Sequence, residues 1–309
     1  MSDKKQLSHS AYRRYLNCPK SYDNHYNKRI RQVGTSSALV FGTAIDEALN
    51  ALLTDKGNPH AVFKEHFTFE MVEGIKFHKD DYDYHLFSVD QLEKLKGKST
   101  DYANWASLRI KGRMMIDAYI EEIVPLIKKV HSVQMELKGR RGFIDAILEI
   151  DGYGKVLIDH KTASRAYKDD VINADTQLHL YALDQGIDKV GFIVLNKKIE
   201  HNKVCSKCKR KCVSSHKTCP QEVRGKRCFG EWDRTPSINV QVIINKVNVF
   251  QTKILSNSVS DVENAIDIGV YPANLGACHS FYGANCPYLD FCRKGDMIGL
   301  EHQPEEKKK

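Results

Sequence analysis

The chain has no apolar run of the length that a membrane span requires, about 18–20 consecutive residues. Its start, MSDKKQLSHS, is polar and basic and contains no apolar h-region of the kind found in secretory signals. These absences exclude a transmembrane protein. They predict a soluble, cytoplasmic protein that makes no membrane contact.

The chain also lacks an even number of cysteines, which a complete set of disulfides would require. The nine cysteines form three groups: Cys18 alone, five between Cys205 and Cys228, and three between Cys278 and Cys292. An odd number in a chain without an export signal is atypical of a disulfide framework. The distribution instead indicates metal or cluster ligation.

Neither sign of charge dominates the composition. The 309 residues include 47 Lys and Arg against 39 Asp and Glu, a net +8, with 41% apolar and 28% charged residues. This length and composition are typical of one large globular domain or two modest ones. The charge is uneven, because residues 201–234 carry a net +7 and residues 1–34 a net +6, which leaves −5 for the rest.

The apolar pattern predicts one continuous α/β domain. Ser8 and Ser10 are candidate N-caps of a first helix, a second helix is predicted over 41–53, and most of 60–130 is expected to be helical. From about residue 132, alternation predicts two or three strands that end near 163 and include the turn 151–154. A helix over 169–186, strands over 189–196 and 238–247, and a helix near 258–268 follow.

Four parts are expected along the chain. They are a helical N-terminal part (1–131), a core (132–200 and 235–270), a small insertion (201–234) and a Cys-bearing C-terminal region with a basic tail (271–309). The insertion is rich in Cys and Lys and almost free of aliphatic residues, which predicts a small separate module within one continuous α/β domain.

Two carboxylates mark the chemical centre of the chain. Asp145 lies in an alternating strand, and Asp159 ends the apolar run Val156–Ile158. A hairpin of this length brings both to the same end of the sheet, where hard oxygen ligands suit Mg²⁺ or Mn²⁺. Lys161 falls on the same strand face as Asp159 and can offset charge developing on a phosphate.

A simpler interpretation is that these three are solvent-facing residues at strand ends. Two features favour the metal-site interpretation. The apolar neighbours of Asp159 predict burial, where an unpaired carboxylate is costly. In the following helix, Gln177 and Tyr181 are spaced i,i+4 and therefore point to one side.

The order of these elements resembles the PD-(D/E)XK nuclease superfamily, specifically its RecB-like branch, which includes AddB, CRISPR-associated RecB-like nucleases and phage exonucleases. The matching elements are Gly142-x-x-Asp145, Asp159-His160-Lys161, Gln177-x-x-x-Tyr181, Ser10-x-x-x-x-Tyr15-x-x-Cys18-Pro19 and Gly42-Thr43-Ala44-Ile45. The resemblance covers nearly the whole chain except the insertion and implies a restriction-endonuclease-like core with a central mixed sheet flanked by helices.

The resemblance also implies roles for these residues. Asp145 and Asp159 would hold one or two divalent metals with the His160 carbonyl, Lys161 would be the catalytic lysine, and Gln177 and Tyr181 would contact DNA or brace the site. The family usually has His where this chain has Asp46. Asp46 is therefore a candidate metal ligand, and a solvent-facing helix residue is the alternative.

Four cysteines lie outside the insertion: Cys18, Cys278, Cys286 and Cys292. Such a set suits a 4Fe–4S cluster or a structural zinc, and unliganded buried thiols are the third possibility. AddB-type and CRISPR-associated RecB-like nucleases bind a 4Fe–4S cluster with one upstream and three downstream cysteines, which the resemblance implies here. The Cys278–Cys286 gap is longer than in the family, and His279 is a substitute ligand.

The insertion has zinc-ribbon spacing at Cys205, Cys208, Cys219 and Cys228, with Cys212 and His216 as surplus candidates. A disordered basic loop with reactive thiols is the alternative. The cations of the insertion predict contacts with nucleic-acid phosphates that do not distinguish between bases. The candidate DNA-binding residues are Lys207, Lys209, Arg210, Lys211, Arg224, Lys226 and Arg227. Trp232 and Phe229 are expected to pack under the ribbon rather than stack on a base.

Together these features predict a Mg²⁺- or Mn²⁺-dependent deoxyribonuclease, an exonuclease on DNA ends or single strands in replication, recombination or repair. The resemblance places it in a bacterial or phage-infected cell, with replication or recombination proteins as partners. A catalytically idle DNA-binding or assembly subunit is the main alternative. A zinc-ribbon nucleic-acid-binding protein with an α/β scaffold is another.

Overall fold

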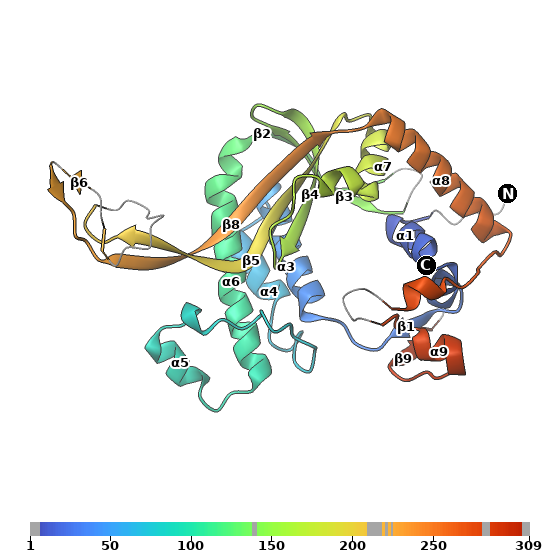
Figure 1. The fold of residues 1–309 in the computed structure, drawn as a ribbon, viewed down its shortest axis with the longest axis horizontal. Helices are drawn as coiled ribbons and strands as arrows, with labels where there is room; N and C mark the ends of the chain where they lie inside the picture. The colour runs from blue at the N-terminus through green and yellow to red at the C-terminus, as the bar shows by residue number, and fades with distance from the viewer. Residues whose placement is uncertain are drawn as a thin grey trace.

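Five strands form the central sheet in the computed structural model, which describes residues 7–137, 141–208, 218–219, 222–223, 225–279 and 285–304. Their order is β2-β3-β4-β5-β8. The strands are β2 (Ile127–Glu136), β3 (Phe143–Ile150), β4 (Gly154–Ala163), β5 (Lys189–Cys205) and β8 (Trp232–Lys246). All neighbours are antiparallel except β4 and β5, which are parallel. The expected α/β fold with a mixed central sheet flanked by helices is confirmed (Figure 1).

Helices cover both faces of this sheet. One layer contains α3 (Ser37–Leu53), α4 (Pro59–His66) and α6 (Thr100–Glu122), packed on Ile158 and Ile193 of the strands. The other contains α1 (His9–Asn17), α7 (Thr176–Gln185) and α8 (Val249–Asp267), packed on Leu157 and Phe192. Adjacent residues of β4 and β5 therefore point into opposite cores, as the alternation of a strand requires.

The two chain ends meet on one side of the molecule. Strands β1 (Ile30–Gln32) and β9 (Leu300–His302) pair antiparallel, with Ile30 opposite His302. Around them lie α2 (Pro19–Tyr22), the π-helical turn η1 (Asp23–Asn27), the 3-10 turn η5 (Leu275–Cys278) and α9 (Leu289–Lys294). Ile30, Tyr288 and Leu300 are the buried apolar contacts of this region.

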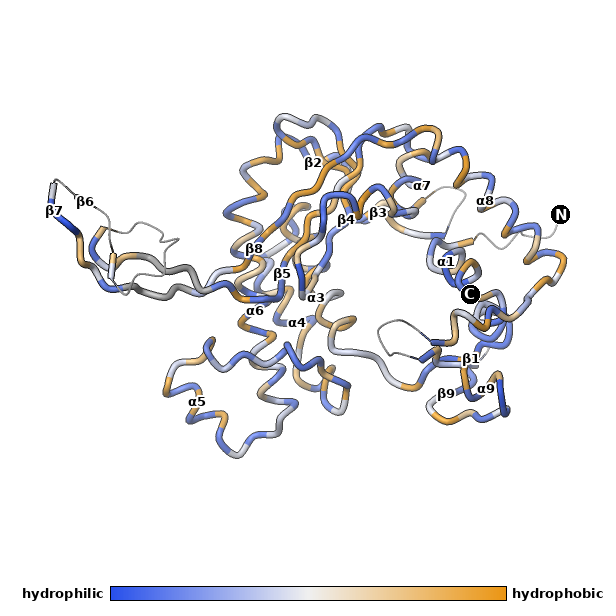
Figure 2. The backbone as a smooth tube through the Cα atoms, viewed as in Figure 1, coloured by the Kyte–Doolittle hydropathy of each residue, from blue (hydrophilic) through white to orange (hydrophobic). Residues whose placement is uncertain are grey.

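The hairpin of β5 and β8 extends well beyond the sheet as an arm (Figure 1). Its ladder continues as far as Cys205 opposite Trp232, and the two-residue strands β6 (Glu222–Val223) and β7 (Lys226–Arg227) lie at its far end. Figure 2 shows apolar stretches in the sheet and a hydrophilic β7 at the tip. The predicted strands 189–196 and 238–247 were thus too short, because both continue into the region expected to be an insertion.

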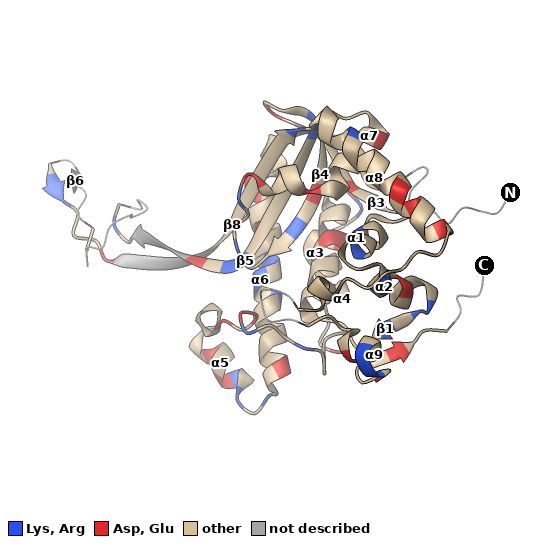
Figure 3. Ribbon diagram, turned by 45° about the vertical axis from the view of Figure 1, so that its right-hand side comes forward, with Lys and Arg blue, Asp and Glu red and all other residues tan. Residues whose placement is uncertain are grey.

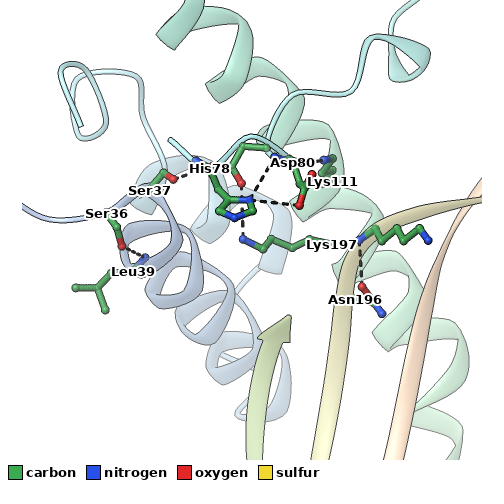
Figure 4. A network of polar contacts seen from close by, with 10 residues as sticks. Ser36, Ser37, Leu39, His78, Asp80, Lys111, Asn196 and Lys197 are labelled. Carbon is green, nitrogen blue, oxygen red and sulfur yellow. Dashed lines mark hydrogen bonds and ion pairs between the residues drawn. The ribbon is translucent and has the colours of Figure 1, made fainter. Parts of the chain in front are cut away.

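The helical structure predicted over most of 60–130 is divided into several elements in the structure. Residues 67–83 are turns, the 3-10 turn η2 (Tyr84–Leu86) and the short helix α5 (Val89–Leu95) follow, and β2 already begins at Ile127 after η3 (Val124–Leu126). Contacts with residues distant in sequence determine how this region is divided. The buried Asp81 carboxylate accepts hydrogen bonds from Ser37 Oγ and the His78 amide, both 2.8 Å, and Lys197 Nζ lies 3.7 Å away (Figure 4).

Two other predicted helices have different starting points. The helix expected over 169–186 begins at Thr176, after the 3-10 turn η4 (Val171–Ala174), because the Asp175 side chain caps it by accepting from the Leu178 amide at 2.9 Å. The helix expected near 258–268 begins at Val249. Ser8 is the N-cap of α1, whereas Ser10 lies within that helix. Among the described residues, no helix is long and apolar enough to cross a membrane.

Candidate active site

Asp46, Asp145 and His160 come together beside the sheet. One carboxylate oxygen from each aspartate and one ring nitrogen of the histidine lie within 4.8 Å of one another. They come from α3, β3 and β4. Figure 3 shows acidic positions on α3 and on the neighbouring strands. The three residues therefore converge only in the folded chain.

Asp46 is positioned by the buried face of α3. Its neighbour Ile45 and the residue Leu49 are buried in the core, which leaves Asp46 at the edge of that face. Asp46 Oδ2 accepts hydrogen bonds from Gln134 Nε2 at 2.9 Å and Asn50 Nδ2 at 3.4 Å. Its other oxygen, Oδ1, is buried without a hydrogen-bond partner among the described residues.

His160 and Asp145 are joined across the β3–β4 pair. The His160 amide donates to Asp145 Oδ2 at 2.9 Å, and His160 Nε2 lies 3.0 Å from the Tyr119 hydroxyl of α6. The remaining ring nitrogen, Nδ1, is buried and has no partner in the part of the chain that the structure describes. The resemblance implied the His160 carbonyl as a ligand, and the structure brings the His160 ring into this group as well.

The donor set fits a divalent cation. Burial, followed by the Asp145 charge, raises the pKa of Asp46 to about 7. Burial lowers the pKa of His160 to about 4, so its imidazole is neutral and able to ligate. A cation would neutralise the two carboxylates and satisfy the unpartnered Oδ1 and Nδ1 atoms, whose burial is otherwise costly.

Asp159 and Lys161 form a tight ion pair beside this group. Their Oδ2 and Nζ atoms are 2.5 Å apart, and Asp159 is only 5% exposed. Burial raises the pKa of Asp159, and the Lys161 charge opposes that rise. Burial lowers the pKa of Lys161, but the Asp159 carboxylate outweighs it, so Lys161 is held as an ammonium. The expectation that both lie on one face of a strand is met.

Helix α7 closes the other side of the site. Burial, and then the charges of Asp159 and Asp145, raise the pKa of Tyr181 to about 12, and Gln177 hydrogen-bonds the Tyr181 side chain. The Tyr181 hydroxyl lies 2.6 Å from where a Cβ on Gly142 would be. The Gly142 of the sequence motif is therefore required for close approach of this tyrosine.

Several residues of the site carried no recognisable signal in the sequence. Gln134 and Asn50 hold Asp46, and Tyr119 contacts His160. His9 of α1 lies 2.6 Å from Thr176 Oγ1 at the start of α7. Gln134, Tyr119 and His9 act across long sequence separations, so only spatial proximity identifies them, whereas Asn50 lies one helical turn after Asp46 and could have been found from that spacing.

The four predicted zinc ligands come together at the base of the arm's tip. The sulfurs of Cys205, Cys208, Cys219 and Cys228 are mutually within 4.8 Å, with Sγ–Sγ distances of 3.5 Å (Cys205–Cys228) and 3.7 Å (Cys208–Cys219). A tetrahedral zinc with Zn–S bonds of about 2.3 Å requires separations of about 3.8 Å. Burial raises the pKa of Cys205, but amide hydrogen bonds from Cys208 and Lys207 lower it to a net value of about 6, which favours the thiolate.

The candidate DNA-binding residues of the arm are described only in part. Lys207, Lys226 and Arg227 are exposed near the cysteines. Phe229 is 59% exposed, with the Arg227 guanidinium 6.0 Å from its ring, so it is not packed under the tip as expected. Outside the described residues lie Lys209, Arg210, Lys211, Arg224, Cys212 and His216.

The four remaining cysteines gather where the chain ends meet. The Asn274 amide donates to Cys18 Sγ at 3.4 Å, and the Cys286 amide donates to the Cys278 carbonyl at 2.9 Å. Burial and the charges of Cys278, Cys292 and Cys18 raise the pKa of Cys286. Among the described residues, however, no three of these sulfurs lie within 4.8 Å of one another.

The family model for the PD-(D/E)XK nuclease superfamily matches residues 6–293. No curated protein matched the chain. The matched range includes the mixed sheet, the carboxylates of α3, β3 and β4, and the lysine two residues after Asp159. The chain therefore belongs to the PD-(D/E)XK nuclease superfamily.

Proposed function

We propose that this protein is a divalent-metal-dependent DNA nuclease of the RecB-like type, acting as an exonuclease on DNA ends or single strands. The observation that carries the proposal is the convergence of Asp46, Asp145 and His160 next to the Asp159–Lys161 pair. Superfamily members are generally nucleases that use divalent metals, and this arrangement supplies the ligands and the lysine together.

In this proposal, Asp46, Asp145, Asp159 and His160 hold Mg²⁺ or Mn²⁺. The bound ion would supply Lewis-acid stabilisation of charge on the scissile phosphate. The Lys161 ammonium, fixed by Asp159, positions the attacking water and offsets the charge that develops on the phosphate oxygens. Gln177 and Tyr181 brace the opposite wall.

The test is cleavage of linear DNA in Mn²⁺ by purified variants. Lys161→Ala and Asp159→Ala should each reduce the rate at least about 100-fold, the size of effect seen when a preorganised electrostatic group is removed. Lys155→Ala, an exposed lysine on the same strand, is the matched control and should cleave normally. Wild-type rates in the two site variants would refute the catalytic assignment, whereas DNA binding without cleavage by the wild-type protein would favour an idle DNA-binding subunit.

A second substrate separates exonuclease from endonuclease activity. We expect linear DNA to be degraded and covalently closed circular DNA to survive. Nicking or linearisation of the circle at a comparable rate would replace the exonuclease proposal with an endonuclease. On the resemblance alone, we assign the activity to DNA replication, recombination or repair in a bacterial or phage-infected cell.

We also propose two structural metal sites. Zinc at Cys205, Cys208, Cys219 and Cys228 is supported by the 3.5 Å and 3.7 Å sulfur separations. A 4Fe–4S cluster at Cys18, Cys278, Cys286 and Cys292 is supported by the resemblance and by the proximity of the other three thiols to Cys286, whose pKa they help to raise.

Metal analysis and a visible spectrum of anaerobically purified protein test both sites. The expected result is about one zinc per chain together with iron and a broad brown absorption. The Cys208→Ser variant should lose the zinc and keep the iron. The Cys286→Ser variant should lose the iron and keep the zinc. Colourless protein with two zincs would refute the cluster and leave the nuclease proposal intact.

A further inference from the structure

Two adjoining hollows lie along α6, on the side bordered by α4 and α5. One has a volume of about 250 Å³ and is lined by Phe87, α5 and α6, and the other, of about 320 Å³, is lined by α4 with its capping residue and α6. Arg109 and Arg113 line both hollows, one helical turn apart, so the two form a continuous depression. We call it the α6 groove.

The charged groups in the α6 groove have one sign. Its cations are Lys64, Lys94, Arg109 and Arg113, and none of the described residues that line it is acidic. Among the described residues, no ion pair engages these four cations. The nearby Asp117 is paired with His60 at 2.9 Å and leaves the arginines uncompensated. Four unpaired cations along a depression indicate a polyanionic occupant.

Aromatic rings line the same groove. Trp105 and Tyr102 are partly exposed, with ring centroids 5.1 Å apart, and the Arg109 guanidinium lies 4.8 Å from the Trp105 ring centroid. Trp105 Nε1 donates to the Phe67 carbonyl at 3.2 Å, which fixes the indole. Rigid aromatic rings between cations are the arrangement on which unpaired bases stack while phosphates contact Lys and Arg.

The helix that bears the groove also braces the metal-binding group. Tyr119 of α6 contacts the His160 ring at 3.0 Å. Tyr119 is the sixth residue after Arg113, which corresponds to a rise of about 9 Å along the helix axis. The groove and the metal-binding group are therefore linked by one helix.

We propose that the α6 groove binds single-stranded DNA, with Arg109 and Arg113 on the phosphates and Tyr102 under a base. This inference rests on the proposed nuclease function and adds the strand state of the substrate. Single-stranded rather than duplex DNA is favoured because stacking on Tyr102 requires an unpaired base.

The first test is the salt dependence of binding. A labelled single-stranded oligonucleotide of roughly 20 nucleotides is titrated with protein, without added Mg²⁺ or Mn²⁺ so that it is not cleaved. The double variant Arg109→Ala/Arg113→Ala should weaken binding at least about tenfold and reduce the slope of log K against log salt by about 1.4, since each phosphate contact on a single strand contributes about 0.7.

Lys253→Ala, an exposed lysine on α8 outside the groove, is the matched control and should keep the wild-type slope. An unchanged affinity and slope in the double variant would overturn the proposal and leave the groove to a protein partner. The double variant must also retain its thermal stabilisation by Mn²⁺, which shows that the metal-binding group is intact.

The second test separates stacking from charge. Tyr102→Leu should weaken single-strand binding about fivefold or more, with no change in salt slope and no change in duplex binding. Equal losses on single-stranded and duplex DNA would refute base stacking. Failure of the nuclease proposal is distinguishable, because these binding measurements do not depend on cleavage, whereas the Lys161→Ala comparison does.

Discussion

At the scale of single residues, Asp46 is the least expected member of the site. The resemblance places a histidine at this position, and Asp46 could equally have faced solvent. The structure instead leaves Asp46 half-buried, with its Oδ1 atom shielded from solvent, beside Asp145 and His160. A buried carboxylate next to another carboxylate disfavours its own ionised form, which is why the pKa of Asp46 rises to about 7.

This raised pKa predicts opposite effects of Asp46→Asn with and without metal. Above pH 7 the ionised Asp46 destabilises the metal-free folded protein, so Asp46→Asn should increase its free energy of unfolding by about 2 kcal/mol. The same change removes a ligand charge and should weaken Mn²⁺ binding at least about tenfold. Thermal unfolding at pH 8 with and without Mn²⁺ measures both effects.

The neighbouring Glu47 provides the control for this experiment. Its side chain is exposed on the next position of α3. Glu47→Gln should change neither the metal-free stability nor the shift produced by Mn²⁺ by more than about 0.5 kcal/mol. If Asp46→Asn behaved like Glu47→Gln, Asp46 would be excluded from the metal site.

At the scale of elements, α6 connects three features. It contacts His160 through Tyr119, lines the α6 groove with Arg109 and Arg113, and packs on α4. The packing depends on Gly112, because a Cβ there would lie 2.1 Å from Cζ of the Phe63 ring. Phe63 is fully buried, so its ring cannot swing into solvent.

Gly112→Ala should therefore destabilise the protein despite the higher helix propensity of alanine. Overpacking of this kind costs about 1–3 kcal/mol, which exceeds the gain of about 1 kcal/mol from replacing a helical glycine. The measurement is the free energy of unfolding in urea. Phe63→Leu/Gly112→Ala should recover part of the loss, and a strictly additive double variant would contradict the steric explanation.

At the scale of the whole molecule, the charge is divided between elements. The described cations of α1 and α2 and the exposed Lys226 and Arg227 of β7 lie apart, the first group on the side of the β1–β9 pair and the second at the far end of the arm, with the central sheet between them (Figures 1 and 3). The α6 groove adds a third cationic surface on the core itself. This division places cations where DNA would be held and carboxylates where metal would be bound.

Buried histidines determine how the whole fold responds to acid. Burial lowers the pKa of His9, His25 and His160 to about 4. Unfolded histidine has a pKa of about 6.5, so between pH 6.5 and 4 the unfolded state binds more protons at these positions. Their contribution to stability is complete above pH 6.5 and falls as pH decreases to 4. The carboxylates of Asp46 and Asp159 oppose this loss, because their raised pKa values mean that the folded state binds more protons at these two positions.

His25 allows this acid response to be tested away from the nuclease site. Tyr288 donates its hydroxyl proton to the Ile30 carbonyl at 2.9 Å, so His25 Nδ1, 2.9 Å from the same hydroxyl, must be the donor. His25→Asn retains a donor but does not titrate. Its loss of unfolding free energy between pH 7 and pH 5 should be about 1 kcal/mol smaller than that of wild type, a value reduced for partial exposure.

Several features could be predicted from sequence because they are local. The turn 151–154 and the alternation around it predict the β3–β4 hairpin, and the hairpin places Asp145 near Asp159. Strand alternation places Asp159 and Lys161 together, and the short Cys-x2-Cys spacing of Cys205 and Cys208 predicts a thiolate site. In each case a period or a spacing of a few residues determines the geometry.

Only the tertiary structure decided the remaining features, because they depend on contacts between distant segments. The burial of Asp46 requires Gln134, and the division of 60–130 depends on Asp81 meeting Lys197. The α6 groove arises because α4 and α5 pack on either side of one helix. The sequence of α6 has no clear apolar face at helical periodicity, so the face that it buries and the neighbours that turn its exposed face into a groove are both set by long-range packing.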